Sequence, residues 1–425
     1  MNIRRTNFEV SFPFNRILDS YFLILFSIIP VSIILGPAVS LIVILLIDFS
    51  FVSLMLYKKE YKFLSNRTVK LILLFCLYLI FNSIISKDFE ASALRNFSFI
   101  RFGILFCAFN YFFYYKTIFN KVFIIWLFLF FLIIIDVYVE SFTGTNILGY
   151  GEAYPRRIVS FFKDELIVGG FVNAFYLILA GYCFSLNSKF SKNYKYFILA
   201  GSLFFFVAIL LTVERSNTIK AFLGLLIFYI VNDHFNKRQK FFSALAMLTA
   251  MVILFSSSES LKFRYGAVFL TPIIDEFRTE KRLTTSDQPN VYFNLYRSGI
   301  KVFKENPLLG VGNKNYRIVC NTESSPKISC STHPHQIYFE FIAEHGILGS
   351  VVLLFILFNL VFSKSTIIFK SKNYIQIGAY IFLLISFIPL LPSGAFFSDY
   401  SLTIFWLNLS LMYSVNKRTN IYSYN

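Results

Sequence analysis

Long apolar runs recur along almost the whole chain and restrict its fold more than any other feature. Each run is about 16 to 22 residues long, enough for a helix to cross the roughly 30 Å hydrocarbon layer of a bilayer. Inside lipid, only helices and closed barrels satisfy every backbone hydrogen bond. Hydrophobic residues make up 56% of the 425 residues and charged residues 15%, which is too apolar for a soluble domain. The sequence therefore predicts an all-α, polytopic integral membrane protein.

The apolar runs predict about twelve transmembrane helices. These lie roughly at residues 18–36, 38–56, 68–86, 96–115, 118–139, 165–186, 194–212, 217–232, 241–256, 336–363, 374–391 and 398–414. We expect the first span to act as the insertion signal, because residues 1–20 lack an apolar stretch followed by a small-residue cleavage site. The chain accordingly divides into nine helices in 1–256, a polar segment at 257–335, and three helices with a tail in 336–425.

Basic residues alternate with the predicted spans. They concentrate in every second connection, as at Lys58, Lys59 and Lys62, and at both ends of the chain. Cytoplasmic segments of membrane proteins retain positive charge, so the alternation predicts that both termini are cytoplasmic. The net charge of +17 then reflects topology and contact with anionic membrane lipid, and it requires no nucleic-acid partner.

Two predicted outer connections, 140–164 and 257–335, are longer than the others. Within the second, residues 291–305 carry apolar side chains on one helical side and Arg297, with two lysines, on the other. Pro307 ends this segment, and the following glycines turn the chain. The pattern predicts an amphipathic helix at the outer membrane surface, inside a long periplasmic loop.

Two cysteines lie in that outer loop, whereas the other three fall within predicted spans. In an oxidising compartment Cys320 and Cys330 can form a disulfide. The alternative is a zinc site completed by His333 and His335. We favour the disulfide because the spacing matches no familiar zinc module, and we expect no metal.

Three of the four histidines lie between residues 331 and 349, at the start of one apolar run. Pro334 resists helix, which places His333 and His335 on extended chain just before a helix begins. There an imidazole can face a polar ligand, or it can merely anchor the end of the helix. His345 lies deeper and is expected to pack.

Arginines mark two more predicted outer positions. Arg215 follows Glu214 between two spans, and Arg157 precedes another span. A surface pair of Glu214 with Arg215 would need no function. However, topology places Arg157, Arg215 and His335 on one side of the membrane, where guanidinium groups suit phosphate oxygens and an imidazole suits proton abstraction.

Several motifs in this half of the chain resemble a known family. GVGNKNY (310–316), followed by HPHQIYFEFIAEHGILG (333–349), is similar to the signature of the O-antigen ligase and O-antigen polymerase superfamily. TVERSNTIKAF and PRRIVSFFKDELIVGGF resemble further elements of that family. The resemblance covers roughly residues 156–354, and the first five spans match the family in number alone.

The resemblance implies a metal-independent, inverting glycosyltransferase without a cofactor. Such a protein moves a glycan from undecaprenyl diphosphate to an acceptor hydroxyl at the periplasmic face of the bacterial inner membrane. By this likeness Arg215 and Arg157 would bind the diphosphate, and His335 would be the catalytic base. Four further residues would support the site, namely His333, Gln336 in place of the usual Asn, Arg297 as the nearest basic residue in the amphipathic helix, and Glu344.

Three functions remain open from the sequence. The leading hypothesis is a ligase that transfers the glycan to lipid A-core, and the nearest alternative is a polymerase that extends a growing glycan on the same carrier. A polysaccharide-lipid transporter is the third. Transport predicts ionisable residues near mid-membrane and two related halves. Charges inside the predicted spans are few, and the long outer loop has no counterpart in the first half.

Overall fold

The computed structural model describes residues 13–151, 157–163, 165–186, 194–263, 265–266, 291–320 and 330–423. Within these ranges every regular element is a helix, which confirms the all-α prediction. The helices are α1 (Pro13–Leu35), α2 (Pro37–Lys58), η1 (Lys62–Ser65), α3 (Arg67–Ile84), α4 (Phe89–Ser98), α5 (Ile100–Tyr115), η2 (Thr117–Lys121), α6 (Val122–Thr143), η3 (Ser160–Phe162), α7 (Val168–Ser185), α8 (Tyr194–Leu211), α9 (Arg215–Val231), α10 (Lys237–Ser257), α11 (Glu259–Leu261), α13 (Val291–Glu305), α14 (Tyr316–Cys320), α15 (Ile337–Phe362), α16 (Ser365–Ser371), α17 (Tyr374–Ser386) and α18 (Asp399–Ser414).

In the described part of the chain, nine helical stretches are long and apolar enough to cross a membrane. The prediction of about twelve spans is therefore supported only in part. The remaining three predicted spans are helices, but α9, α17 and α18 have 17, 13 and 16 residues. The count of twelve stays a prediction.

Helix α17 is shorter than the predicted span 374–391 for a local reason. Pro389 cannot donate a backbone hydrogen bond, and the residue before a proline disfavours helical geometry. The helix ends at Ser386, and the chain then continues to α18 as an irregular segment. This 387–398 segment contributes residues to the candidate site described below.

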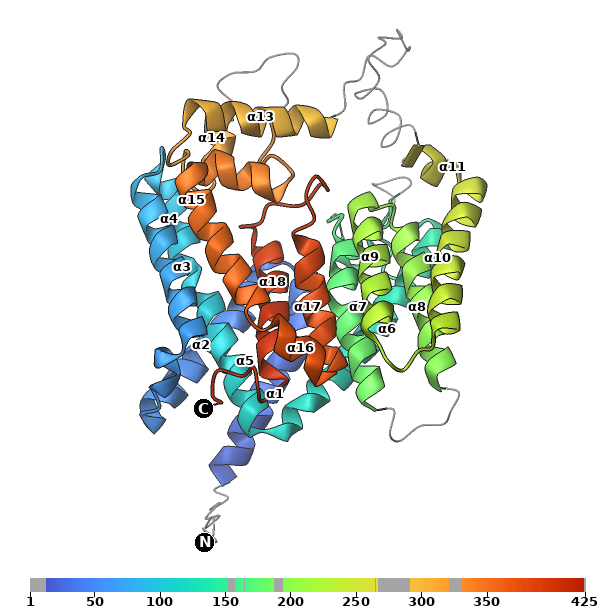
Figure 1. Cartoon of the computed structure of the whole chain (residues 1–425), viewed down its shortest axis with the longest axis horizontal. Helices are drawn as coiled ribbons and strands as arrows, with labels where there is room; N and C mark the ends of the chain where they lie inside the picture. Colours follow the sequence, from blue (N-terminus) through green and yellow to red (C-terminus); the bar gives the residue numbers. More distant parts are fainter. Residues whose placement is uncertain are drawn as a thin grey trace.

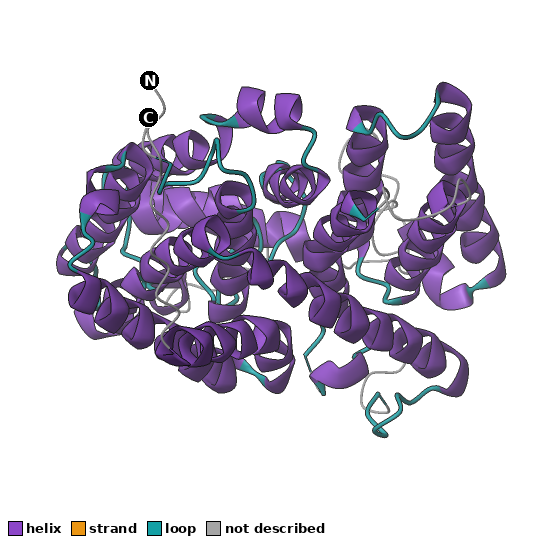
Figure 2. Ribbon diagram, turned by 90° about the horizontal axis from the view of Figure 1, so that it is seen from below, coloured by secondary structure: helices purple, strands orange, loops and turns teal. Residues whose placement is uncertain are grey.

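The helices run mainly in one direction, and α13 lies across one end of them (Figure 1). The start of α1 and the end of α18 lie at the opposite end. Viewed along the bundle, the described chain consists of helices and their connecting loops (Figure 2). Helix α17 packs against α7, α9 and α18, and so joins the middle of the chain to its C-terminal part.

Helix α13 occupies the residues predicted for the amphipathic helix. Leu295 and Val302 are buried, whereas Arg297 and Lys304 are exposed, as the periodicity predicts. The buried side packs on α15, where the rings of Tyr296 and Phe339 stack with their centroids 4.9 Å apart. The apolar side of α13 is therefore covered by α15, in addition to any membrane surface.

Helix α15 is kinked at Gly346, whose φ is 63°. At the kink, backbone N–H and C=O groups of α15 lack partners within the helix. The turn after α13 forms hydrogen bonds with them. Val311 N and Gly312 N donate to the carbonyls of Ala343 and Glu344, while Ile347 N donates to the Pro307 carbonyl. A Cβ on Gly346 would lie 2.4 Å from Leu308 O. The backbone segments around Gly310 and Gly346 therefore pack directly against each other.

Candidate active site

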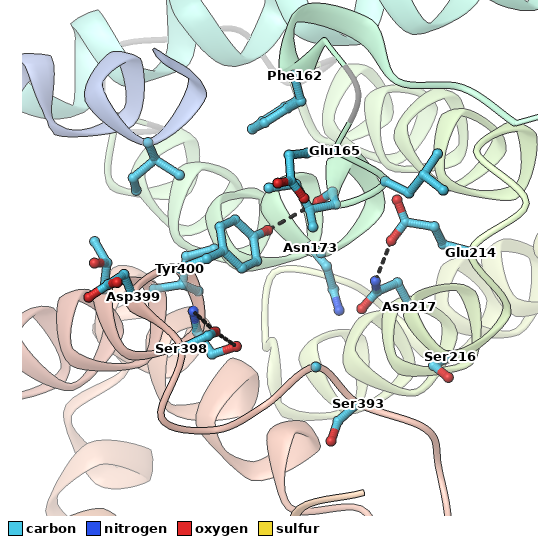
Figure 3. A pocket seen from close by; sticks show the side chains of 18 of the residues that line it. Phe162, Glu165, Asn173, Glu214, Ser216, Asn217, Ser393, Ser398, Asp399 and Tyr400 are labelled. Atoms are coloured by element: carbon cyan, nitrogen blue, oxygen red, sulfur yellow. Dashed lines mark hydrogen bonds between the residues drawn. The ribbon is translucent and has the colours of Figure 1, made fainter. Parts of the chain in front are cut away.

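A cavity of about 870 Å³ opens among the helices near the end that α13 covers. Its walls come from the α1–α2 connection, Arg95 of α4, the segment before α7, the start of α9, and the segment between α17 and α18. Figure 3 shows Glu214 and Ser216 on one side of this pocket, Asp399 on the other, and Tyr400 between them.

The cavity brings together the three residues singled out from the sequence. Arg157, Arg215 and His335 all line it, although they come from separate parts of the chain. Arg156 lies outside the described residues. The expected convergence of two guanidinium groups and one imidazole on a shared space is therefore present in the structure.

Tyr292 of α13 lies between Arg215 and His335. The Arg215 guanidinium carbon is 5.5 Å from the centre of the Tyr292 ring, and its Nη2 is 3.5 Å from the phenolic oxygen. The Tyr292 and His335 rings meet edge to face with centroids 6.3 Å apart. An aromatic face can hold a guanidinium in place without neutralising its charge, so the sequence analysis, which sought a basic residue at this position, missed a positioning contact.

His335 is held firmly from its backbone. It has a φ of 56°, a left-handed conformation that non-glycine residues rarely adopt. Its carbonyl accepts a hydrogen bond of 2.8 Å from Ser393 N, and Ser331 Oγ lies 3.3 Å from its Nε2. Burial lowers the pKa of His335 below its usual 6.5, because desolvation penalises the charged imidazolium. The neutral imidazole, the form that can accept a proton, is thus favoured at neutral pH.

His333 packs beside His335. Its ring lies 3.9 Å from the His335 ring, centroid to centroid, and its Nε2 is 3.4 Å from the Ser393 carbonyl. Burial first, and then the neighbouring His335, lower the pKa of His333 to about 4. Two adjacent imidazoles that both stay neutral avoid mutual repulsion.

Glu214 does not form the simple surface pair considered from the sequence. Its carboxylate is buried and accepts hydrogen bonds from Gly169 N at 2.8 Å and from Asn217 Nδ2 at 2.6 Å (Figure 3). Burial raises its pKa, while these donors and the Arg157 guanidinium oppose the rise. The carboxylate therefore joins the start of α7 to the start of α9 in the cavity wall.

All four predicted supporting residues, His333 included, lie outside the described cavity lining. Gln336 caps α15, with its Oε1 accepting from Tyr338 N at 2.8 Å and from Phe339 N at 3.2 Å. Glu344 is buried next to the turn before α14, with its Oε1 3.4 Å from Tyr316 N. Arg297 is exposed on α13 and donates to Asn294. Their contacts are structural, because each shapes a helix end or a loop.

Cys320 and Cys330 are joined by a disulfide, which links the end of α14 to the segment that carries His333 and His335. The zinc alternative is not supported, since the described residues contain no group of three or more metal-ligating side chains close together.

Sequence reasoning also missed an ion cluster and a lysine in the cavity wall. Asp399 Oδ1 contacts Arg95 Nη1 at 2.7 Å and also contacts Arg101 Nη2. Lys220 lies five residues after Arg215 on α9 and lines the same space. Asp399, Arg101 and Lys220 fall within predicted spans. Charged side chains in a span are energetically costly and tend to mark functional sites, so the sequence did contain a signal for them.

The described lining carries a surplus of positive charge. Arg95, Arg157, Lys163, Arg215 and Lys220 face three carboxylates from Glu165, Glu214 and Asp399. By formal charge, these described lining residues are positive by two.

A bundle of apolar helices around this basic, histidine-containing cavity indicates a multi-pass membrane protein with an internal polar cavity. Residues 200–354 match the family model described as O-Antigen ligase, and this match supports an O-antigen ligase-like superfamily. The matched range includes Arg215, Tyr292 and His335. No curated protein is significantly similar to the chain. The match supports a membrane enzyme of the O-antigen ligase or polymerase type, acting on a lipid-linked glycan and an acceptor.

Proposed function

We propose that this protein is a glycan ligase that transfers a glycan from undecaprenyl diphosphate to a sugar hydroxyl of lipid A-core. The observation that carries the proposal is the convergence of Arg157, Arg215 and His335 on one cavity. We place the reaction at the periplasmic face of the bacterial inner membrane, with both termini in the cytoplasm. Tyr292 of α13 contributes to the cavity lining, and α13 lies at the end of the bundle opposite the start of α1 (Figure 1).

In the proposed reaction the His335 imidazole accepts the proton of the acceptor hydroxyl. The hydroxyl oxygen then forms a bond to the anomeric carbon as the bond from that carbon to the diphosphate oxygen breaks. The diphosphate leaves with the bonding electron pair, and a single in-line displacement inverts the anomeric centre. The pKa of His335, lowered by burial, keeps the base unprotonated at neutral pH.

Arg215 and Arg157 stabilise the leaving group in this proposal. Guanidinium groups donate paired hydrogen bonds to phosphate oxygens, and fixed positive charge at a departing diphosphate lowers the barrier most where negative charge develops. Two guanidiniums supply this stabilisation, so the reaction demands no divalent cation. Tyr292 would keep the Arg215 guanidinium aligned beside His335.

The direct test uses purified full-length protein in detergent with a labelled undecaprenyl-diphosphate glycan and a lipid A-core acceptor. We expect transfer by the wild type in the presence of EDTA and none by His335→Ala, with both proteins inserted and folded to the same extent. Transfer by His335→Ala at more than about a tenth of the wild-type rate would contradict the role of the base, since general bases contribute roughly 10²–10⁴-fold.

A polymerase would use the same donor and the same residues, so a second experiment separates the two acceptors. In cells that lack the gene, a ligase defect leaves every lipid A-core uncapped. A polymerase defect instead leaves core that bears a single repeat unit. The first outcome supports the ligase proposal, and the second replaces it.

A further inference from the structure

Lys220 and Asn173 belong to the cavity wall, but the proposed reaction leaves them unused. Lys220 is half-buried on α9, and Asn173 is 2% exposed on α7. Figure 3 shows the Asn173 side chain pointing into the pocket. In the described part of the chain, neither side chain has a hydrogen bond or an ion pair. Buried polar groups without partners are costly, so these two indicate a ligand in the cavity.

Helices α7 and α9 pack side by side and run in the same direction. At one level of the pair, a Cβ on Gly170 would lie 3.3 Å from Asn217 Nδ2. About two turns farther along, a Cβ on Gly224 would lie 3.3 Å from Leu177 Cδ1. The sequence separation of the two partners is the same in both contacts, so the helices keep one register over this length.

Asn173 and Lys220 have that same sequence separation and lie between the two contacts. They therefore lie at one level of the cavity wall. Lys220 comes five residues after Arg215, which is about 7.5 Å farther along the helix axis at 1.5 Å per residue. Beyond Lys220, α7 and α9 carry no charged side chain before the apolar contact at Gly224. In the proposed topology Lys220 is thus the deepest charge on this wall, farther into the membrane than Arg215.

A phosphate group suits this pair of side chains. An ammonium and an amide N–H₂ are both hydrogen-bond donors, and lysine binds phosphate as a point charge. The nearest carboxylate along α9 is that of Glu214, and it already accepts from Gly169 N and Asn217 Nδ2. The positive charge therefore favours an anionic ligand over a neutral sugar.

The donor of the proposed reaction has two phosphates at different depths. Its sugar-side phosphate must lie beside the anomeric carbon, and hence near His335 and Arg215. Its lipid-side phosphate carries the hydrocarbon chain and must lie nearer the interior of the membrane. Lys220 lies in that direction along α9 from Arg215.

We propose that Lys220 and Asn173 bind the lipid-side phosphate of the donor, whereas Arg215 binds the sugar-side phosphate. This inference rests on the proposed function, because it takes a polyprenyl diphosphate as the donor. The lipid-side subsite binds the carrier whether or not the carrier bears a glycan. Lys220 and Asn173 are binding residues, and neither exchanges a proton in the reaction.

Binding of carriers that bear no glycan tests this division of the two phosphates. Purified full-length protein in detergent is titrated with undecaprenyl phosphate and with undecaprenyl diphosphate. Lys220→Met removes the charge and keeps an unbranched side chain. We expect it to raise the Kd of both carriers about tenfold, the cost of losing a hydrogen bond between charged groups. Arg215→Lys should weaken the diphosphate alone, because the monophosphate has no sugar-side phosphate.

Further variants separate lost charge from lost structure. Lys220→Arg keeps the charge and should bind both carriers within about threefold of wild type, and Asn173→Leu should raise the Kd of undecaprenyl phosphate about fivefold, the cost of one neutral donor. Undecaprenol has no phosphate and should bind the wild type and Lys220→Met equally. Lys304→Met is the matched control, because Lys304 is exposed on α13 outside the cavity lining, and it should leave every Kd unchanged.

An unchanged Kd of undecaprenyl phosphate in Lys220→Met would overturn the lipid-side subsite. An equal loss of monophosphate binding in Arg215→Lys would also overturn it, because one site would then bind both phosphates. If an equal amount of phosphatidylglycerol displaces undecaprenyl phosphate, a general phospholipid phosphate is the ligand and the assignment to the carrier fails. Absence of glycan transfer by the wild type, with the expected binding results, would instead refute the proposed function and retain the carrier subsite.

Discussion

At the scale of single residues, Arg215 is distinguished from the other arginines by its surroundings. It lines the cavity beside the Tyr292 ring, whereas Arg297 is exposed outside that cavity. Arg215 and Arg297 carry the same charge but differ in position. Comparing the same substitution at both residues therefore separates the effect of position from the effect of charge.

Arg215→Lys keeps the positive charge and loses the planar fork that binds two phosphate oxygens. We expect the transfer rate to fall roughly tenfold to a hundredfold, the cost of losing hydrogen bonds to a charged group. Steady-state kinetics with the purified protein would measure the change. Arg297→Lys should stay within about twofold of wild type, and an equal loss in both variants would show that Arg215 has no special role.

The same scale predicts a pH dependence. His335 must be neutral to accept a proton, and burial lowers its pKa below 6.5. Activity should therefore be low in acid, rise as the pH passes through this lowered pKa, and level off above it. The acid limb of kcat/KM should have its midpoint below pH 6.5. A midpoint at or above that value would mean that a different group limits the reaction.

At the scale of elements, the kink of α15 and the turn after α13 depend on each other. Gly346 has a positive φ, and the loop lies against it so closely that a side chain has no room. The turn in question also carries Lys314 and the residues that lead to the disulfide. Through α14 and the disulfide, this turn connects the kink to the segment that carries His333 and His335.

Gly346→Ala should lower the thermal unfolding midpoint of the detergent-solubilised protein. The added Cβ would overlap Leu308 O, and overpacking typically costs about 1–3 kcal/mol. Gly201→Ala is the control, because a Cβ on that helical glycine meets nothing within 4 Å, and we expect no loss there. Equal midpoints for Gly346→Ala and wild type would show that the loop yields to the extra atom.

At the scale of the whole molecule, the proposed topology places α13 outside and both termini inside. The start of α1 and the end of α18 lie at the end of the bundle opposite α13, as an even number of crossings requires. Helices α9, α17 and α18 are shorter than the other predicted spans. The number of membrane crossings therefore depends on whether these three helices cross the membrane.

Cysteine labelling of intact cells tests this topology. Lys304→Cys on α13 should react with a membrane-impermeant thiol reagent from outside, and Arg418→Cys should react only after permeabilisation. Cys183 is free and partly exposed, so it is replaced by serine in both variants. The remaining background is expected to be low, because Cys76 and Cys107 are buried and Cys320 and Cys330 are bonded to each other. Labelling of Arg418→Cys in intact cells would place the C-terminus outside and rule out the twelve-helix arrangement.

The sequence by itself determined the all-α membrane class, the amphipathic helix at 291–305 and the three residues that meet in the cavity. These features depend on local patterns, namely runs of apolar residues, helical periodicity and motifs whose residue types suit one chemistry. The distances between Arg215, Tyr292 and His335, the sharing of Asp399 by two arginines and the bracing of Gly346 by a distant turn were decided only by the tertiary structure. Such contacts join residues far apart in the chain, and no local pattern records which partners the folded helices bring within a few ångströms.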